Sequence, residues 1–320
     1  MNMKAATQPI KTLTKKQDKR NALVKNIWNH KLMYMLLIPG IIYVFLFRYV
    51  PMYGITLAFK DINLSEGLYG GVWVGFKYFT RIFESSMFVN ALRNTIIINL
   101  LKMLTHLVIP VAIALFMNEI TREWYKRTLQ TAIYMPRFVS WVVYGGIVTL
   151  MLSPESGVVN ALVKLFGGTP VFFLSKPEYF KAILIISDMM KEAGWSAVVY
   201  IAAISTVDIQ QYEAALMDGA SKLQRIRHIT LPGIATTIII MFTLRVGSMM
   251  SAGLDQVFNL YNPIVFETGD VLDTLTYRLG IEQGDISLGT AAGVFQSTIG
   301  FVLVLISNWF AKRMNNTSLF

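Results

Sequence analysis

Four residues between positions 188 and 195 are the strongest candidates for chemistry in this chain. Asp188, Lys191, Glu192 and Trp195 are spaced i, i+3, i+4 and i+7, which places them on one face of a helix. They lie in an otherwise apolar stretch, where ionisable groups are costly and mark functional positions by default. We expect Asp188 to pair with Lys191, whereas Asp188 and Glu192 repel weakly. Such a face should point at a water-filled pathway or at a partner helix.

Arg245 is a further ionisable residue inside an apolar stretch. It lies 13 residues beyond Pro232, roughly 20 Å along a helix, and Glu192 lies 15 residues before Val207, roughly 22 Å along the preceding helix. Because the two predicted helices are antiparallel, Arg245 and Glu192 reach similar depth. This predicts a buried ion pair of Arg245 with Glu192 or Asp188 that locks the two helices together.

Other kinds of chemistry lack the residues that they need. A phosphate-binding loop requires Lys after its second glycine, but Phe76 follows Gly75 in the nearest match, which begins at Gly70. There is no cysteine, and no nucleophile stands in a pattern with a base. The histidines are too scattered to argue for a metal site: His30, His106 and His228. We therefore expect no cofactor on this chain, and no ATP hydrolysis or other enzymatic reaction by it alone.

The elements that must position these residues are membrane helices. The chain of 320 residues is 54% hydrophobic and 15% charged, with a mean hydropathy of +0.50, whereas soluble domains carry about 25% charged residues. Six apolar stretches have nearly the ~20 residues that cross a bilayer. They run approximately over residues 32–50, 94–117, 131–152, 182–207, 233–250 and 288–310. The sequence thus predicts an all-α membrane protein with a six-helix bundle.

The distribution of charge predicts the orientation of the bundle. The net charge is +10, and the basic residues gather in the N-terminal tail and in the second-to-third and fourth-to-fifth connections, whereas the fifth-to-sixth connection is acidic. Nucleic-acid binding is another reading of a basic chain, but here the tail directly precedes an apolar stretch. We therefore predict cytoplasmic N- and C-termini, with no cleaved signal peptide. Arg48 and Arg137 are predicted to be interface anchors.

The segment between residues 212 and 232 differs from the membrane stretches. Its residues favour helix, Gly219 interrupts it, and Pro232 can begin the next membrane helix. Leu216 and Leu223 fall near one apolar stripe, together with Ala220 and Ile226, and the basic residues lie elsewhere. The segment is therefore an amphipathic helical element. It either lies on the inner leaflet or docks into a groove of a cytoplasmic partner.

This segment resembles the EAA motif of binding-protein-dependent ABC importer permeases. The motif positions are Glu213, Ala214, Ala215, Gly219, Ala220, Ile229, Leu231 and Pro232, and Asp218 matches the sugar-importer version. Where that version often has Phe, this chain has Ile226. The resemblance implies a type I importer fold and a coupling helix seated in a cleft of the ATPase subunit. The implied coupling residues are Glu213, Ala214, Ala215, Leu216, Asp218, Gly219, Ala220, Leu223 and Ile226.

Other segments resemble the LplB-like branch of polysaccharide-type sugar permeases. The matching segments are residues 50–54, 58–61, 73–76, 94–95, 254–258 and 308–320. That branch implies an oligosaccharide cargo. Met190 stands where Trp is expected, which weakens any assignment of the sugar. The candidates for the substrate pathway are Asp188, Lys191, Glu192, Trp195, Tyr200 and Arg245.

The resemblance also implies the surroundings of the chain. They comprise a second permease subunit, two ATPase subunits or domains that hold ATP and Mg, an external solute-binding lipoprotein, and the lipids of a bacterial plasma membrane, with no nucleic acid. The expected organisation is a cytoplasmic tail (1–31), a six-span permease domain (32–313) with a coupling loop at 208–232, and a short tail (314–320). The alternative functions are an ion-coupled secondary transporter of a small polar solute and a membrane enzyme. The first uses intramembrane carboxylates but has no reason to carry the 213–232 segment.

Overall fold

The computed structural model describes residues 28–63, 67 and 70–315 and divides the chain into two compact units, Met1–Thr56 and Leu57–Phe320. The two predicted tails lie largely outside the described residues. In the first unit, α2 (Lys31–Val44) continues through a π-helical turn (Phe45–Tyr49) into a 3-10 helix (Val50–Phe59). This continuous run is long and apolar enough to cross a membrane, and none of the α2 side chains is buried. The first predicted stretch is confirmed as a candidate span.

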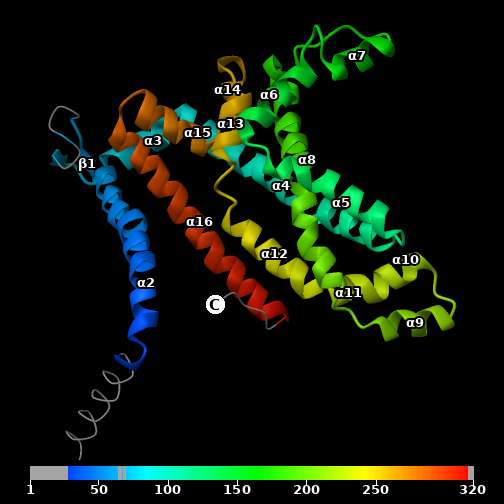
Figure 1. Cartoon of the computed structure of the whole chain (residues 1–320). Coiled ribbons are helices and arrows are strands. Elements are labelled where there is room, and N and C mark those ends of the chain that lie inside the picture. Colours follow the sequence, from blue (N-terminus) through cyan, green and yellow to red (C-terminus); the bar gives the residue numbers. More distant parts are fainter. Residues whose placement is uncertain (1–27, 64–66, 68–69, 316–320) are drawn as a thin grey trace, which may run out of the picture. The chain divides into compact units, whose positions relative to one another are not determined.

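The second unit is built on two long helices that pack along each other, α4 (Ser86–Asn118) and α8 (Pro177–Ile204). Beside them α12 (Ala235–Gly247) packs on α16 (Ile286–Asn315), as Figure 1 shows. Within the described residues the strands are β1 (Lys60–Asp61) and β2 (Val72–Trp73), which pair antiparallel. The prediction of an all-helical membrane protein is confirmed.

The third predicted stretch is not one straight helix. It divides into α5 (Glu123–Phe138) and α6 (Trp141–Leu152), which are bent by 105°. The chain is extended at Val139 and Ser140, and the Ser140 side chain caps the start of α6 by accepting a hydrogen bond from the backbone N–H of Val143. One continuous apolar stretch of the sequence therefore contains a sharp bend between two helices.

The fifth predicted stretch is also broken. A short α11 (Leu231–Gly233), with Pro232 in its first turn, meets α12 at Ile234, and the helices on either side of this break are bent by 61°. Among the described residues, three helices are long and apolar enough to cross a membrane, over residues 31–59, 86–118 and 286–310, and the number is up to five if each bent pair is one span. The helix α8 is not among them because it carries five charged residues, and six spans are not established.

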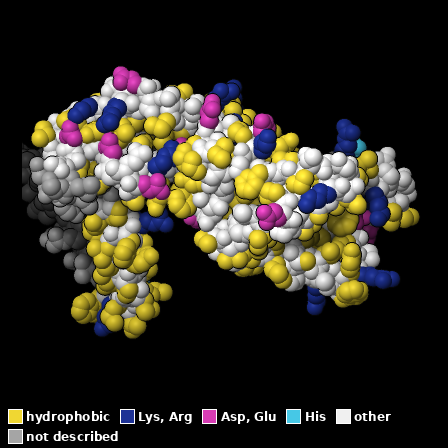
Figure 2. Space-filling view, turned by 90° about the horizontal axis from the view of Figure 1, so that it is seen from above, with side chains coloured by type: hydrophobic (Ala, Val, Ile, Leu, Met, Phe, Trp, Pro, Cys, Tyr) yellow, Lys and Arg dark blue, Asp and Glu magenta, His cyan; other side chains and the backbone are white. Residues whose placement is uncertain are grey.

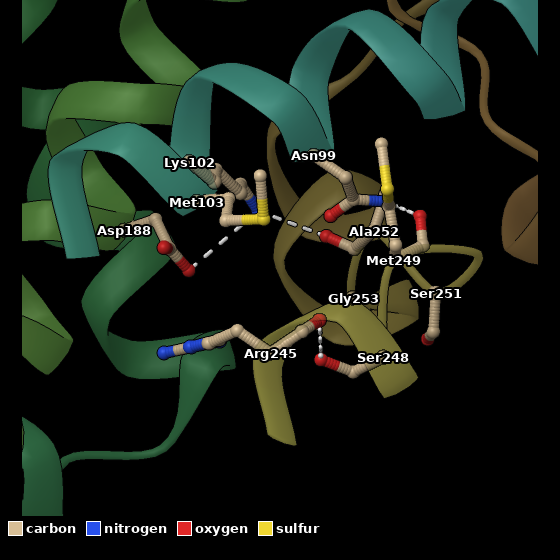
Figure 3. A pocket seen from close by; sticks show the side chains of 10 residues that line it. All are labelled: Asn99, Lys102, Met103, Asp188, Arg245, Ser248, Met249, Ser251, Ala252 and Gly253. Carbon is tan, nitrogen blue, oxygen red and sulfur yellow. Dashed lines mark hydrogen bonds and ion pairs between the residues drawn. The ribbon is translucent and has the colours of Figure 1, made fainter. Parts of the chain in front are cut away.

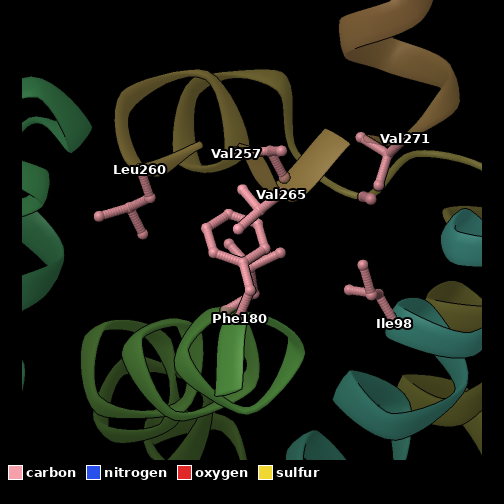
Figure 4. Close-up of a cluster of buried hydrophobic side chains, with 8 residues drawn as sticks. Ile98, Phe180, Val257, Leu260, Val265 and Val271 are labelled. Carbon is pink, nitrogen blue, oxygen red and sulfur yellow. The ribbon is translucent and has the colours of Figure 1, made fainter. Parts of the chain in front are cut away.

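The acidic connection before the sixth stretch is folded. It contains α13 (Leu254–Leu260), a 3-10 turn (Pro263–Val265), α14 (Phe266–Gly269), α15 (Leu272–Tyr277) and a π-helical turn (Arg278–Glu282). Its apolar residues form a core with Ile98 of α4 and with Phe180 and Leu184 of α8 (Figure 4). Seen from above, this part of the surface carries acidic and basic side chains among apolar ones (Figure 2).

The remaining helices are short and lie at the ends of the unit. They are α3 (Lys77–Glu84), α7 (Val158–Leu165), a 3-10 turn (Phe173–Ser175), α9 (Ile209–Met217) and α10 (Lys222–Arg225), which continues as a π-helical turn (Ile226–Thr230) into α11. Figure 1 shows α7 and α9 at opposite ends of the second unit. The long helices therefore separate two groups of short ones.

Candidate functional site

A network of buried polar side chains joins α4, α8 and α13 in the middle of the second unit. Lys102 is 7% exposed and donates hydrogen bonds to the backbone carbonyl of Ala252, at 2.8 Å, and to the side-chain oxygen of Gln256. Its Nζ atom also lies 3.5 Å from a carboxylate oxygen of Asp188. The amide of Gln256 in turn donates to Leu184 and Ser187. All the donors at this point therefore find acceptors, as buried polar groups must.

His106 extends the network to α12. Its Nε2 atom lies 2.6 Å from Oδ2 of Asp188, and its Nδ1 atom lies 2.9 Å from Nη2 of Arg245. Because a guanidinium can only donate, Nδ1 must accept, and the ring proton then sits on Nε2 and is donated to Asp188. His106 is thus a neutral link between a carboxylate and a guanidinium.

A cavity of about 170 Å³ opens beside this network. Figure 3 shows its lining side chains, which come from α4, α8, the end of α12 and the turn that follows α12. Lys102, Asp188 and Arg245 supply charge, while Asn99, Ser248 and Ser251 supply neutral polar groups. Such a lining can hydrogen-bond to a polar solute in a region whose helices are otherwise apolar.

The structure corrects two predicted ion pairs. Asp188 pairs with His106 and Lys102, and not with Lys191. Glu192 pairs with Arg137 at 2.8 Å, and not with Arg245. Both predictions considered only α8 and α12, although α4 and α5 also pack on α8 and present the basic groups that pair with Asp188 and Glu192. Arg137, which is also predicted to be an interface anchor, joins α5 to α8 through this ion pair.

Lys191 stabilises the corner between α5 and α6. It is 2% exposed, and its ammonium group donates to the backbone carbonyls of Pro136, Arg137 and Val139 at 3.0, 3.1 and 2.6 Å. These carbonyls lie at the end of α5, where few backbone N–H groups are available to them. Pro136 also accepts the backbone N–H of Val139 at 3.3 Å. The geometry gives Lys191 a structural contact rather than a place on the cavity wall.

The two predicted aromatic candidates lie in different surroundings. Trp195 is 46% exposed and makes an edge-to-face contact with Phe138, whereas Tyr200 is 1% exposed. Tyr200 lines a second, smaller pocket together with His106 and Arg245. Tyr200 and Arg245 are therefore near each other, but Trp195 and Glu192 do not line the described cavity.

Sequence reasoning missed the contribution of α4. Lys102 and His106 are ionisable residues inside the second apolar stretch and are spaced i, i+4, so the rule that selected Asp188 also selects them. His106 was considered only as a metal ligand. In the part of the chain that the structure describes, no group of three potential metal-binding side chains is present.

The predicted coupling segment forms a protruding pair of short helices. Asp208 caps α9 through the backbone N–H of Gln210, and Ser221 and Gln224 form a reciprocal capping box on α10. Four large apolar side chains of the segment are exposed: Ile209 at 69%, Leu216 at 59%, Met217 at 87% and Leu223 at 74%. Ala220 and Ile226 are half-buried. The apolar side chains are available for contact with another protein.

Gly219 makes the turn between the two helices. Its φ of +74° is in the left-handed region, which glycine adopts at little cost, and the preceding helix ends just before it. Glu213 is not at the helix start, because α9 begins four residues earlier and Asp208 occupies the cap. The Lys222 ammonium lies 2.9 Å from Glu119, which follows the last residue of α4. An exposed ion pair therefore joins the segment to the helix that carries Lys102 and His106.

Comparison with known proteins agrees with this architecture. A family model described as "Binding-protein-dependent transport system inner membrane component" matches residues 106–316. The chain belongs to this family, which comprises the membrane permease subunits of ABC importers, as the EAA motif indicated. It is therefore a membrane protein and a transport subunit.

Two curated relatives from Bacillus subtilis (strain 168) cover almost the whole chain. Protein LplB is 39% identical over 98% of this chain and 97% of the relative. The polygalacturonan/rhamnogalacturonan transport system permease protein YteP is 38% identical over 95% of each. The resemblance to the LplB-like branch is confirmed.

Solved structures show the same fold. The crystal structure of a bacterial ABC transporter involved in the import of the acidic polysaccharide alginate contains a chain that matches this one with a TM-score of 0.86 at 37% identity. The match covers 92% of this chain and 99% of that chain. A second structure, of the alginate transporter in complex with an alginate pentasaccharide-bound periplasmic protein, matches with a TM-score of 0.85.

Proposed function

We propose that this chain forms half of the translocation pathway for an oligosaccharide that an external solute-binding protein delivers. The observation that carries the proposal is the charged cavity between α4, α8 and α12. The named cargoes of the relatives are a polysaccharide and oligomers derived from polysaccharides, which supports a sugar as the solute. Neutral and charged hydrogen-bonding groups on one wall suit the dense hydroxyls of a sugar.

The coupling segment gives the proposed energy source. We infer that α9 and α10 dock into a cleft of a separate ATPase subunit, with the exposed apolar side chains of Leu216 and Leu223 in contact and Gly219 allowing the turn. ATP and Mg then belong to that partner. A second permease subunit supplies the other wall of the pathway, since the cavity of one chain is open on one side. The membrane is proposed to be the bacterial plasma membrane, with both termini cytoplasmic.

Reconstitution tests this function directly. The complete complex, purified with its partner permease and ATPase, is placed in proteoliposomes with the binding protein, and uptake of labelled oligogalacturonate is measured with and without ATP. We expect uptake only with both ATP and the binding protein. Uptake that continues without ATP and stops when ionophores remove ion gradients would instead support an ion-coupled transporter.

Variants of the cavity separate a pathway role from a structural one. Ser248→Ala removes one hydroxyl from the exposed end of α12 and breaks only a local bond to the Arg245 carbonyl, at 3.0 Å. We expect this variant to assemble normally and to change the apparent affinity for sugar in ATP-driven uptake. Unchanged uptake in Ser248→Ala, Ser251→Ala and Asn99→Ala, with normal assembly, would remove the cavity from the pathway.

A further inference from the structure

The connection between α6 and α8 contains a rigid hairpin built around Asn160. This residue is 1% exposed, and its amide nitrogen donates to the backbone carbonyls of Leu152, Ser153 and Val171, each at 3.0 Å. Its carbonyl oxygen accepts the backbone N–H of Val171 at 2.8 Å. At the base of the hairpin Gly157 lies so close to the carbonyls of Met151 and Ser153 that a Cβ atom would not fit. These contacts of Asn160 and Gly157 therefore fix the position of α7.

The helix held in this way displays an apolar stripe to its surroundings. Val158, Leu162, Leu165 and Phe166 are spaced i, i+4, i+7 and i+8, and they are 60, 52, 77 and 85% exposed. Asn160 and Lys164 lie on the other side of the helix. Holding four large apolar side chains in water is unfavourable, so we expect another surface to cover the stripe.

The position of the stripe identifies that surface. The preceding helix α6 exposes Val142, Val143, Ile147 and Leu150, as expected of a helix that faces lipid, and only five residues separate its end from α7. The stripe therefore begins at the level where a lipid-facing helix leaves the hydrocarbon. Aromatic residues favour this level, and Phe173 and Tyr179 pack edge to face at the other end of the connection.

The composition of the hairpin distinguishes lipid from a protein partner. Lys164 and Lys176 are exposed and can meet lipid phosphates, while the stripe itself has no polar side chain. A binding protein must dock and leave in each transport cycle, and interfaces of that kind have polar groups distributed through them.

We propose that α7 is an interfacial anchor, with Val158, Leu162, Leu165 and Phe166 inserted at the boundary between headgroups and acyl chains, on the side of the bilayer away from the coupling segment. This role is separate from the passage of the cargo. It would hold the connection between α6 and α8 at the membrane surface while the rest of the unit moves.

The absence of cysteine from the chain allows a direct test. Leu165→Cys, within the stripe, and the neighbouring Lys164→Cys, which points about 100° away around the helix axis, are each labelled with an environment-sensitive NBD probe. The labelled complex is placed in phosphatidylcholine nanodiscs that contain phosphatidylglycerol, with unsubstituted complex carried through the labelling as background. We expect blue-shifted emission at position 165 and about twofold or more stronger quenching there by lipids spin-labelled near the headgroup.

Two further measurements make the outcome decisive. The first is made on the triple variant Leu162→Ser, Leu165→Cys, Phe166→Ser. Its labelled probe should emit at the wavelength of a probe in water, and the complex should still assemble. Equal, water-like emission at positions 164 and 165 overturns the proposal. So does a blue shift at position 165 that develops only when the binding protein is added, because the stripe would then be a protein-docking surface.

Discussion

His106 and Asp188 come within 2.6 Å of each other, although they are 82 residues apart in the sequence. The imidazole lies on α4 and the carboxylate on α8, so their hydrogen bond joins the two helices that pack most extensively in the second unit. Both groups are almost fully buried, and Lys102 and Arg245 flank them. This arrangement concentrates the polar interactions of the unit at one depth.

Loss of the Asp188 charge should destabilise the unit strongly. Asp188→Asn leaves Lys102 buried without its carboxylate and replaces one of the two accepting oxygens, which face Lys102 and His106, by a donating NH2 group. Breaking a buried pair costs about 3–5 kcal/mol. We expect a lower thermal unfolding midpoint and reduced uptake. The matched control is Glu123→Gln, whose partner Arg127 lies 3.6 Å away on the exposed surface, where such pairs contribute about 0.5 kcal/mol or less. Equal losses in both variants would contradict this reading of the network.

Lys191→Met should loosen the corner between α5 and α6. The carbonyls of Arg137 and Val139 then lose the ammonium donor, while the Pro136 carbonyl keeps the backbone N–H of Val139. Each buried polar group left unsatisfied costs about 1–3 kcal/mol. Hydrogen exchange by mass spectrometry should show faster exchange in peptides that contain residues 136–142, whereas the exposed substitution Lys312→Met should leave that region unchanged. If exchange at the corner stays slow without the ammonium group, the corner is held by other contacts.

Gly219→Val should uncouple ATP hydrolysis from transport. A positive φ costs a side-chain-bearing residue about 1–2 kcal/mol, and more for a β-branched one, while Asn tolerates it. No atom lies within 4 Å of an added Cβ, so the strain comes from the backbone alone. ATPase recruitment and binding-protein-stimulated hydrolysis should fall in Gly219→Val and remain near normal in Gly219→Asn. Normal recruitment, hydrolysis and uptake in the Val variant would remove the coupling role.

Asp61 and Tyr78 define a pH window outside the candidate spans. The Lys77 ammonium, followed by the Tyr78 hydroxyl, holds the pKa of Asp61 below its usual value, and burial together with the bond to Asp61 raises the pKa of Tyr78 to about 12. The Tyr78 contribution to stability is complete below pH ~10 and is lost as the pH rises through the raised pKa. The Asp61 contribution is present above pH ~4 and is lost as the pH falls through its lowered pKa.

An ultraviolet titration of tyrosine ionisation tests this window. The difference between the unsubstituted complex and Tyr78→Phe should show one tyrosine that titrates near pH 12. Asp61→Asn should shift that titration downward, because the negative charge that disfavours phenolate is removed. A titration of Tyr78 near pH 10 in the unsubstituted complex would show that the bond to Asp61 does not form.

The sequence was most informative where a local pattern determines the outcome. The six apolar stretches all lie in helical segments, although the third and fifth are broken, and Gly219 interrupts the coupling segment as predicted. Hydropathy could not reveal the corner at Val139 and Ser140, because a bend within an apolar stretch changes no residue type. The polar capping residue Ser140 was the only local sign of it.

The partners of buried charges could not be derived in the same way. Asp188 has Lys191 at the helical spacing of three, yet it bonds to His106 on another helix. That choice depends on which face of α8 meets α4, which is set by the packing of the whole unit. The sequence indicates only one side of this contact, because the spacing of Lys102 and His106 marks the buried side of α4.

The bend at Ile234 forms a pivot at the start of α12, so a tilt there displaces residues near the far end of the helix. Arg245 lies ten residues beyond Ala235, at a rise of about 15 Å from that pivot. A tilt of about 10° there would displace the guanidinium by about 2.5 Å, comparable to the 2.9 Å that separates it from His106. Because the coupling segment adjoins this bend in the sequence, we expect a tilt of α12 that accompanies movement of the segment to make or break the Arg245–His106 hydrogen bond. Distances between spin labels on α4 and α12, measured in two nucleotide states, would be equal if the pivot were rigid.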